Sequence, residues 1–457
     1  MDPLQLLINT QTPLLQFRPR TDPSDPPWEE ETDLSDLDPK SDYRLSPGGV
    51  TRMVYPLIRR LLAERVCSGA DWVALNPNAP SVVRLSGLTL HNLSLDKERL
   101  GAYGRVKEAM WSQIHGLDAP ANASELFWSE EYGEYAYYNR TTAELIRDLD
   151  RESDFDAFYI HDFQQLSVGH MLDTVKPKMF RWHIPFEVSS IPEEWRAAFA
   201  TYLDSYDVAV VSTDRWKTAL RRFGHQGRVV RIYPYVDPAE YRRPPDTEVE
   251  AVAEKFGIPR EAPVVLVVAR MDPAKGQDRA IRAMARLRTS APEARLVLAG
   301  NGSFSGSAGG LGLSKSDRWR AHLESTARDL GVADRVVFTG HVTQDELDSL
   351  YERATFTVLP STNEGFGLVV VESWLHGKPT VITRRAGIAE LVDDGENGLL
   401  FDPDHEEELV DQMRRLLRDR DGESTRLGAA GLSTAPLCSL DAAVRAEREL
   451  LALAVEA

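Results

Sequence analysis

The sequence predicts an α/β protein built from two doubly wound, Rossmann-like domains that face an interdomain cleft. Short apolar runs typical of buried parallel strands alternate with helical patterns, as at Pro263–Ala269 and Asp278–Leu287. The length of 457 residues exceeds that of an ordinary single domain. A polar stretch with several prolines, residues 242–261, separates two such alternating regions. We therefore place the domain boundary after residue 242.

The composition argues against several classes of function. The chain has 53 Lys and Arg residues and 71 Asp and Glu residues, a net charge of −18, which disfavours non-specific binding to nucleic acid or anionic membranes. No apolar run is long enough for a membrane span, and the start of the chain lacks the features of a signal peptide. Cys67 and Cys438 form neither a disulfide framework nor a metal-ligand pattern. We expect a cytoplasmic protein.

The first half contains fewer clear elements. Arg20–Tyr43 is rich in Pro and Asp and predicts a mobile acidic loop. The Gly48-Gly49 pair precedes an amphipathic helix that continues to Leu62. Short apolar runs at Ala157–Ile160 and Val208–Val211 predict strands, and each run ends in polar residues. Because ligands of open α/β sheets bind beyond the carboxyl ends of strands, these polar residues are functional candidates.

The second half alternates more regularly. The predicted strands are Pro263–Ala269, Arg295–Ala299, Arg335–Gly340, Thr355–Pro360 and Pro379–Thr383. The predicted helices are Asp278–Leu287, Trp319–Leu330, Gln344–Ala354, Gly367–His376, Glu406–Arg418 and Leu440–Val455. Gly302–Ser316, rich in Gly and Ser, predicts a surface insertion. The predicted domains are residues 1–242, residues 243–430 and a C-terminal helix within 431–457 that packs back on the first domain.

The segment Ser361–Glu372 carries the strongest functional signal. Glu364 follows a predicted strand, and Gly365-Phe366-Gly367 leads into a predicted helix. Glycines let a ligand approach the backbone, and the amides at a helix N-terminus favour a phosphate group. Glu372 lies eight residues after Glu364, which is about 12 Å along a helix. The two carboxylates can therefore contact the two ends of one elongated ligand, such as a nucleotide sugar.

The cationic residues that a diphosphate would need lie just after another predicted strand. Arg270 ends the Val-rich run, and Lys275 lies in the loop beyond it. Arg offers a planar fork of donors and Lys a compact charge, and both stabilise a leaving nucleotide. The alternative is an arginine paired with Asp272 and a lysine in water.

In the first half, Asp162 could hold an acceptor hydroxyl, and His183 could hydrogen-bond the transferred sugar. Tyr103 and Trp111 could stack on sugar rings, although aromatic residues are more often part of a core. His161 is expected to be structural.

These motifs together resemble a known family. ARMDPAKG at 269–276, EGFGLVVVE at 364–372 and GIAELVDDGENGLLF at 387–401 resemble the nucleotide-sugar domain of retaining glycosyltransferase family 4, which has the GT-B fold. The first half is similar to trehalose-6-phosphate synthase and to the trehalose glycosyltransferring synthase. The features that carry this similarity are SPGGV at 46–50, YIHDF at 159–163, WHIPF at 182–186, Tyr103 and Trp111.

The resemblance implies roles for the motif residues. The donor would be bound by Gly48, Gly49, Arg270, Lys275, His341, Glu364, Gly365, Phe366, Gly367, Leu368 and Glu372. The acceptor would be bound by Tyr103, Trp111, Asp162 and His183. The catalytic residues would be His183, Asp162, Arg270, Lys275 and Glu364. Within these sets, Glu364 would bind sugar hydroxyls, Glu372 the ribose, and His341 would lie near the base.

At one position, in the expected acceptor site, the sequence departs from the pattern of trehalose-6-phosphate synthases. Trehalose-6-phosphate synthases have an arginine after their first strand that binds the acceptor phosphate, whereas this chain has Thr10 in the segment Leu7-Ile8-Asn9-Thr10. Arg18 or Arg20 could replace it. Free glucose or another small polyol is therefore also a candidate acceptor.

The predicted function is retaining transfer of glucose from UDP-, ADP- or GDP-glucose to glucose or glucose phosphate, which forms a trehalose-type α,α-1,1 linkage. Front-face attack, without a cofactor or a metal ion, is what the resemblance implies. Other acceptors (glycerol phosphate, glycerate or another glycan), a nucleotide-sugar epimerase and a non-catalytic sensor remain alternatives. No nucleic-acid or membrane partner is expected, and the sequence leaves a homodimer open.

Overall fold

A computed structural model of the chain describes residues 2–20, 28–39, 41–46, 49–115, 123–185, 191–300, 311–419 and 422–455. The chain divides into two compact units. The first comprises Met1–Tyr233 and Ala443–Ala457, and the second comprises Pro234–Ala442. The chain thus enters the second unit after Tyr233, before the predicted boundary at 242, and the segment 431–457 is divided between the two units.

The first unit contains a nine-stranded sheet in the order β11-β10-β9-β8-β1-β5-β7-β6-β3. Its strands are β1 (Leu4–Thr10), β3 (Glu31–Asp33), β5 (Cys67–Leu75), β6 (Val82–Leu85), β7 (Leu88–Leu93), β8 (Ala157–His161), β9 (Lys178–Arg181), β10 (Val208–Val211) and β11 (Arg228–Arg231). All neighbours are parallel except β6 and β7. A separate antiparallel pair joins β2 (Leu15–Phe17) and β4 (Tyr43–Leu45). The strand order reverses between β1 and β8, where a doubly wound sheet binds its ligand.

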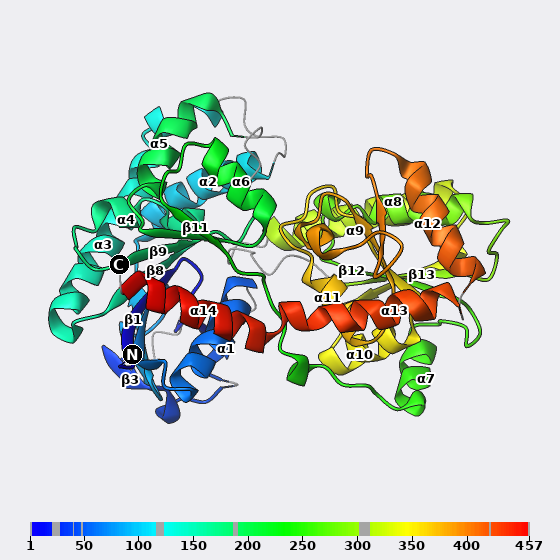
Figure 1. Cartoon of the computed structure of the whole chain (residues 1–457), viewed down its shortest axis with the longest axis horizontal. Coiled ribbons are helices and arrows are strands. Elements are labelled where there is room, and N and C mark those ends of the chain that lie inside the picture. The colour runs from blue at the N-terminus through cyan, green and yellow to red at the C-terminus, as the bar shows by residue number, and fades with distance from the viewer. Residues whose placement is uncertain are drawn as a thin grey trace. The chain divides into compact units, whose positions relative to one another are not determined.

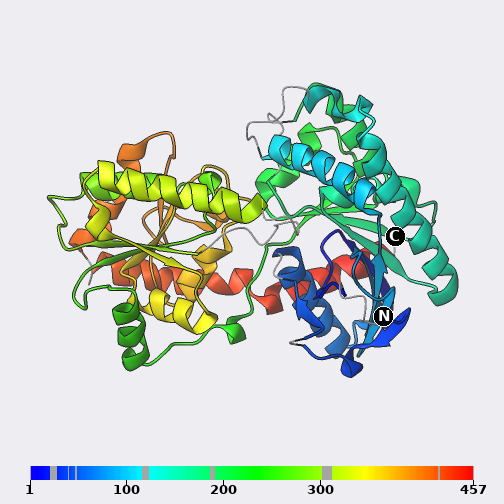
Figure 2. The same cartoon turned by 180° about the vertical axis from the view of Figure 1, so that it is seen from behind.

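The helices of the first unit are α1 (Gly49–Ala63), α2 (Lys97–Ile114), α3 (Tyr132–Ser153), α4 (Val168–Met171), α5 (Glu193–Leu203), α6 (Asp214–Arg222) and the C-terminal α14 (Leu440–Val455). Helices α2 and α3 pack against each other, as Figure 2 shows from behind in cyan and teal. They contribute to one large core, which also contains aromatic residues of β8, β9 and α5.

The acidic segment Arg20–Tyr43 differs from its prediction as a mobile loop. Residues Glu31–Asp33 form β3, which pairs in parallel with β6 at the edge of the large sheet. Asp33 then caps a short 3₁₀ helix by accepting a hydrogen bond from the Ser35 amide. Strand pairing supplies the stability that the local composition does not indicate. Residues 21–27 and Lys40 lie outside the described part of the chain.

Helix α14 returns to the first unit and is anchored there by a buried ion pair (Figure 1, red). Glu447 of α14 pairs with Arg181 at the end of β9, and their side chains are 1% and 3% exposed. The hydroxyl of Tyr159 on β8 lies 3.2 Å from the same carboxylate. Helix α14 is therefore attached to β8 and β9 of the large sheet.

The second unit contains a six-stranded sheet that is parallel throughout, in the order β14-β13-β12-β15-β16-β17. Its strands are β12 (Val264–Val268), β13 (Arg295–Ala299), β14 (Val336–Gly340), β15 (Phe356–Leu359), β16 (Thr380–Thr383) and β17 (Leu399–Phe401). The first five match the predicted strands closely. The order reverses between β12 and β15, so the ligand-binding crevice of such a sheet lies beyond the ends of these two strands.

The helices of the second unit are α7 (Asp246–Lys255), α8 (Gln277–Arg286), α9 (Leu311–Asp329), α10 (Gln344–Arg353), α11 (Leu368–Leu375), α12 (Glu406–Arg418) and α13 (Glu423–Thr434) (Figure 1). Helix α7 lies inside the stretch that the sequence predicts as a polar linker, because Ala253, Val252 and Phe256 pack against α10 and the sheet. Helix α9 begins at Leu311, inside the predicted insertion Gly302–Ser316, whose residues 301–310 lie outside the described part. Within the described ranges, no helix combines the length and the hydropathy needed to span a membrane.

Candidate functional site

The loops that follow β12 and β15 are joined to each other at the switch point of the second sheet. After β12, Asp272 caps the short 3₁₀ helix Pro273–Lys275 by accepting a hydrogen bond from the Ala274 amide at 2.9 Å. The carbonyl of Ala274 in turn accepts a hydrogen bond of 2.9 Å from the amide of Thr362, which follows β15. The two predicted motifs therefore form one structural unit.

Gly276 makes this close approach possible. Its φ of +66° lies in the left-handed region, and a Cβ atom at this position would lie 2.1 Å from the carbonyl oxygen of Pro360. A larger residue would clash with backbone that cannot move independently of β15. Glycine is therefore required here by packing between the two loops.

Lys275 and Glu364 form the centre of the candidate site. The Nζ atom of Lys275 lies 2.7 Å from Oε2 of Glu364, and the side chains are 19% and 16% exposed. The hydroxyl of Ser361 donates to the same oxygen at 3.1 Å. Burial alone would raise the pKa of Glu364, but the Lys275 charge, these hydrogen bonds and the Arg270 charge lower it below its usual value. Glu364 is therefore an ionised hydrogen-bond acceptor that lies among cations.

The chain then enters α11 through a second glycine with a positive φ. Gly367 has φ +105° and precedes Leu368, the first residue of α11, and it offers no side chain to cap the helix. A Cβ atom there would lie 2.8 Å from Cδ2 of Leu359. Phe366 is buried, and its carbonyl accepts a hydrogen bond of 2.8 Å from the Ile388 amide. The glycine lets the backbone run close to β15 and leaves the start of α11 open to an anion.

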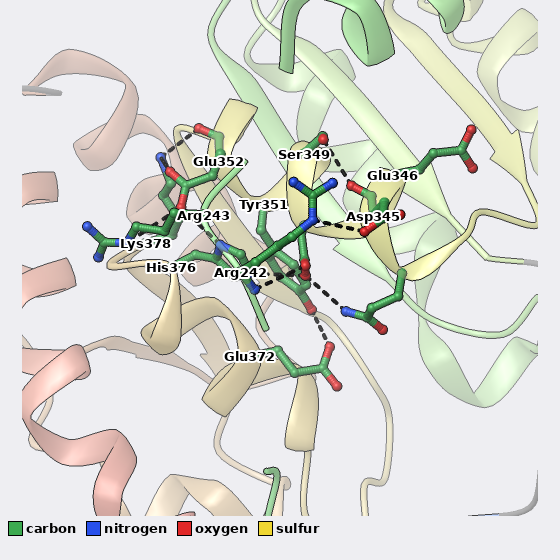
Figure 3. Close-up of polar contacts among 12 residues, drawn as sticks. Arg242, Arg243, Asp345, Glu346, Ser349, Tyr351, Glu352, Glu372, His376 and Lys378 are labelled. Atoms are coloured by element: carbon green, nitrogen blue, oxygen red, sulfur yellow. Dashed lines mark hydrogen bonds and ion pairs between the residues drawn. The ribbon is translucent and has the colours of Figure 1, made fainter. Parts of the chain in front are cut away.

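Glu372 lies one helical turn further along α11 and contacts Tyr351 of α10. The Tyr351 hydroxyl donates to Oε2 of Glu372 at 2.7 Å (Figure 3). His341 follows β14 and is exposed. Of the predicted donor residues, the structure thus brings Lys275 and Glu364 into direct contact and places Glu372 on the helix that begins beside them.

The first unit has a second polar cluster, at the carboxyl ends of β8 and β9. Nδ1 of His161 and Nε2 of His183 are 2.9 Å apart, and the two rings are stacked with centroids 5.2 Å apart. Burial, together with the nearby Arg181 charge, lowers the pKa of both imidazoles well below the usual value, so both are neutral at pH 7. Nε2 of His161 and Nδ1 of His183 are buried and have no hydrogen-bond partner among the described residues.

Asp162 lies between these histidines in the chain and adopts a strained conformation. Its φ is +68°, which is uncommon for a residue other than glycine. Oδ1 accepts a hydrogen bond of 3.3 Å from the His183 amide. Burial raises the pKa of Asp162 to about 7, against the lowering effect of the His183 and Phe163 amides. Strain and an unfavourably buried carboxyl together are typical of a functional position.

The other predicted residues of the first unit are placed as follows. Gly48 lies outside the described residues, and Gly49 is the first residue of α1. Tyr103 is buried in the core, where its ring contacts Tyr138 edge-on. Trp111 is partly buried, and its ring lies 4.2 Å from that of His115.

Sequence reasoning assigned no role to Tyr351, which lies between the recognisable motifs. The structural role expected for His161 stays a prediction, and the structure adds that this residue contacts His183. No local pattern indicates that the Tyr351 hydroxyl reaches Glu372.

Part of the second unit is similar to a known protein family. Residues 248–433 match the family described as glycosyl transferases, group 1. A D-inositol 3-phosphate glycosyltransferase 2 from Catenulispora acidiphila is 39% identical over 202 residues, which are 43% of this chain and 45% of that protein. The chain spans about half the length of the curated relatives it matches.

Solved structures match the chain as a whole. A UDP-forming α,α-trehalose-phosphate synthase from Burkholderia xenovorans has a TM-score of 0.74 at 17% identity and covers 100% of both chains. A sucrose-phosphate synthase from Thermosynechococcus elongatus has a TM-score of 0.68 at 20% identity and covers 98% of this chain and 100% of that one. The two Rossmann-like units therefore form a GT-B fold.

Proposed function

From the premise that residues 248–433 match the family of glycosyl transferases, group 1, we propose that the protein is a retaining glycosyltransferase. It transfers glucose from a nucleoside-diphosphate glucose to a small sugar acceptor and forms a trehalose-type α,α-1,1 linkage. The observation that carries the proposal is the Lys275–Glu364 contact of 2.7 Å at the switch point of β12 and β15. This contact joins a phosphate-binding cation to a sugar-binding carboxylate.

The second unit binds the donor in this proposal. Arg270 and Lys275 contact the diphosphate, and the amides at the start of α11 bind its oxygens. Glu364 accepts hydrogen bonds from the glucose hydroxyls, for which its lowered pKa suits it. Glu372 binds the ribose. The chemistry of these groups supports a ligand that is negative in the middle and rich in hydroxyls at both ends.

The reaction exchanges one bond at the anomeric carbon for another. The bond between C1 and the β-phosphate oxygen breaks, and the acceptor oxygen forms a bond to C1 on the same face. The acceptor hydroxyl loses its proton to an oxygen of the leaving phosphate. Arg270 and Lys275 stabilise the charge that develops on that phosphate, so the protein needs no base of its own.

The first unit binds the acceptor through Asp162 and His183. Thr10, where an acceptor-phosphate arginine is expected, has its hydroxyl held between the Trp72 indole N–H at 2.8 Å and the carbonyl of Thr12 at 2.6 Å. It is neutral and satisfied within the chain. This supports free glucose over glucose phosphate as the acceptor.

A second acceptor is favoured by the sequence relatives. Three of the curated relatives that the chain matches are named D-inositol 3-phosphate glycosyltransferases. A cyclic polyol presents to Asp162 and His183 the same kind of hydroxyl that glucose does. D-inositol 3-phosphate is therefore the second candidate.

An assay of donors against acceptors tests the proposal. UDP-, ADP- and GDP-glucose are each combined with glucose, glucose 6-phosphate, D-inositol 3-phosphate, glycerol phosphate and glycerate. We expect release of nucleoside diphosphate that depends on the acceptor, with a non-reducing disaccharide as the product from glucose. Consumption of the nucleotide sugar without release of diphosphate would indicate an epimerase instead. Tight donor binding without turnover on any acceptor would indicate a sensor.

Asp162→Asn is expected to increase stability and to abolish transfer. The raised pKa, about 7 against an ordinary 3.8, means that the folded chain binds a proton more tightly than the unfolded chain. The free energy of unfolding of the wild type therefore falls as pH rises from about 4 to 7. Asparagine cannot ionise and tolerates the positive φ. Its stability advantage over the wild type should grow by about 2–3 kcal/mol between pH 5 and pH 8.

Urea unfolding at the two pH values measures this advantage, and initial rates measure transfer. Wild-type activity should rise through about pH 7 as Asp162 ionises, whereas the variant should still bind the donor. Equal stability differences at pH 5 and pH 8 would refute the raised pKa, and normal transfer by the variant would refute the acceptor role.

A further inference from the structure

Arg279 of α8 is joined to the loop that follows β15 in the second unit. Its Nη1 atom donates to the Thr362 hydroxyl at 2.8 Å and lies 3.5 Å from the Pro360 carbonyl oxygen. The guanidinium thus contacts the residues on both sides of Ser361, whose hydroxyl donates to Glu364 at 3.1 Å. No role was predicted for Arg279 from the sequence, yet it contacts the segment that leads to Glu364.

The partners of Arg279 differ from those of two other arginines on the same helix. Arg282 pairs with Glu406 of α12 at 2.8 Å. Arg286 pairs with Glu407 of α12. Arg279 is half-buried and, among the residues that the structure describes, has no carboxylate within ion-pair distance. It also lies in the first helical turn, where the helix dipole disfavours a cation. Its position is therefore explained by its contacts with the loop after β15 and not by an ion pair.

The first turn of α8 is fixed to its surroundings. Gln277, the first residue of α8, is 1% exposed. Its Nε2 atom donates to the carbonyl of Arg270 at 2.6 Å, and its Oε1 atom accepts a hydrogen bond of 3.0 Å from the Trp319 indole N–H. The segment after β12, helix α8 and helix α9 are joined in this way. Arg279 therefore reaches the loop after β15 from a fixed base.

Thr362 is held through both its backbone and its side chain. Its amide donates to the Ala274 carbonyl at 2.9 Å, and its hydroxyl accepts from Arg279 at 2.8 Å. Glu364 follows two residues later and lies 2.7 Å from Nζ of Lys275. A contact of that length requires the two loops to keep their relative positions. Loss of the arginine contact would let the segment before Glu364 shift, and small displacements at a binding group are costly.

We propose that Arg279 is a positioning residue of the donor site, which fixes Thr362 and thereby orients Glu364 toward the donor sugar. The inference rests on the proposed function, because it takes Glu364 as the carboxylate that binds the glucose hydroxyls. It adds a residue that acts on the sugar through Glu364. Binding of the glucosyl group therefore depends on Arg279, whereas binding of the nucleoside diphosphate does not.

Calorimetric titration of the whole protein tests the inference. UDP-, ADP- and GDP-glucose are each compared with UDP, ADP and GDP in the absence of acceptor. Arg279→Met should weaken binding of the nucleoside-diphosphate glucose about fivefold or more, the usual cost of one lost hydrogen bond. It should leave binding of the nucleoside diphosphate unchanged. A merely structural role of Arg279 would weaken both kinds of ligand alike and would overturn the inference.

Variants of Thr362 test the same contact from the other side. Thr362→Val removes the acceptor hydroxyl with little change of shape, and it should weaken the nucleoside-diphosphate glucose selectively. Thr362→Ser keeps the hydroxyl and should restore the wild-type affinity. The double variant Arg279→Met with Thr362→Val should match Arg279→Met alone, because both changes remove the same bond. Additive losses, or equal losses in the valine and serine variants, would overturn the inference.

Arg286→Met is the matched control, since it removes an arginine of the same helix whose partner is Glu407. It should leave both affinities unchanged, and a selective loss equal to that of Arg279→Met would overturn the inference. The wild-type titration separates the inference from the proposed function. If the wild type binds neither kind of ligand, the proposed function fails and the inference fails with it. If it binds both, and Arg279→Met leaves both affinities unchanged, only the positioning role fails.

Discussion

Lys275→Ala is expected to lower the rate of glycosyl transfer by about a hundredfold or more, the usual cost of losing one charged donor at a developing negative charge. In the proposed mechanism the variant removes the cation beside the departing diphosphate, and it leaves the Glu364 carboxylate without its partner at 2.7 Å. Glu364→Gln should lower the rate by a similar factor, because it replaces the ionised acceptor of sugar hydroxyls by a neutral amide.

Steady-state rates at saturating acceptor measure both effects. Arg286→Ala is the control, because it breaks an exposed ion pair with Glu407 between helices of the same unit. It should leave kcat/KM unchanged. The double variant Lys275→Ala with Glu364→Gln should lose less activity than the product of the two single losses, because the two side chains act together. Near-normal turnover in both single variants would refute the assigned donor site.

Arg181→Met is expected to destabilise the first unit by about 3–5 kcal/mol, since it leaves the buried Glu447 carboxylate unpaired. Both partners are almost fully buried, and among the described residues only the Tyr159 hydroxyl, at 3.2 Å, remains to hydrogen-bond the carboxylate. Glu447→Gln should also destabilise, by leaving the guanidinium without its counter-charge. Replacing both partners by methionine should recover much of the loss, because no isolated charge is then buried.

Chemical unfolding measures these differences. Tryptophan fluorescence is a suitable probe, because Trp72, Trp182, Trp195 and Trp216 are all buried in the first unit. The transition of this unit should shift, and a chain of two units need not unfold in one step. Arg231→Ala, which breaks a more exposed pair with Asp214, should cost less than about 1 kcal/mol. An equally small effect of Arg181→Met would show that α14 is held by apolar packing alone.

Local patterns in the sequence were sufficient for most of the second unit. Continuous Val-rich runs such as 263–269 predict strands buried on both faces, and Arg295–Ala299 coincides with β13. Helix α12 coincides with its prediction, since its buried residues recur at helical spacing. These elements are encoded by near neighbours in the chain, which is why periodicity finds them.

Local composition gave wrong predictions for segments whose secondary structure is stabilised by contacts with distant parts of the chain. Glu31–Asp33 has no apolar periodicity, yet it forms β3 because β6 offers it an edge to pair with. Helix α7 buries little and was taken as linker, but contact with α10 stabilises it. The predicted surface insertion Gly302–Ser316 extends too far, because its last residues belong to α9, which begins at Leu311.

The amino-acid sequence alone determined which residues are candidates for the site and predicted their chemistry, because Arg270, Lys275, Glu364 and Glu372 lie in motifs whose residue types and spacing suit a nucleotide sugar. Only the tertiary structure decided which groups touch. Lys275 meets Glu364 across 89 residues, Tyr351 meets Glu372 across 21, and Tyr159 meets Glu447 across 288. A hydrogen bond depends on distance in space. The order of strands in a sheet brings such residues together, and no single segment of the sequence determines that order.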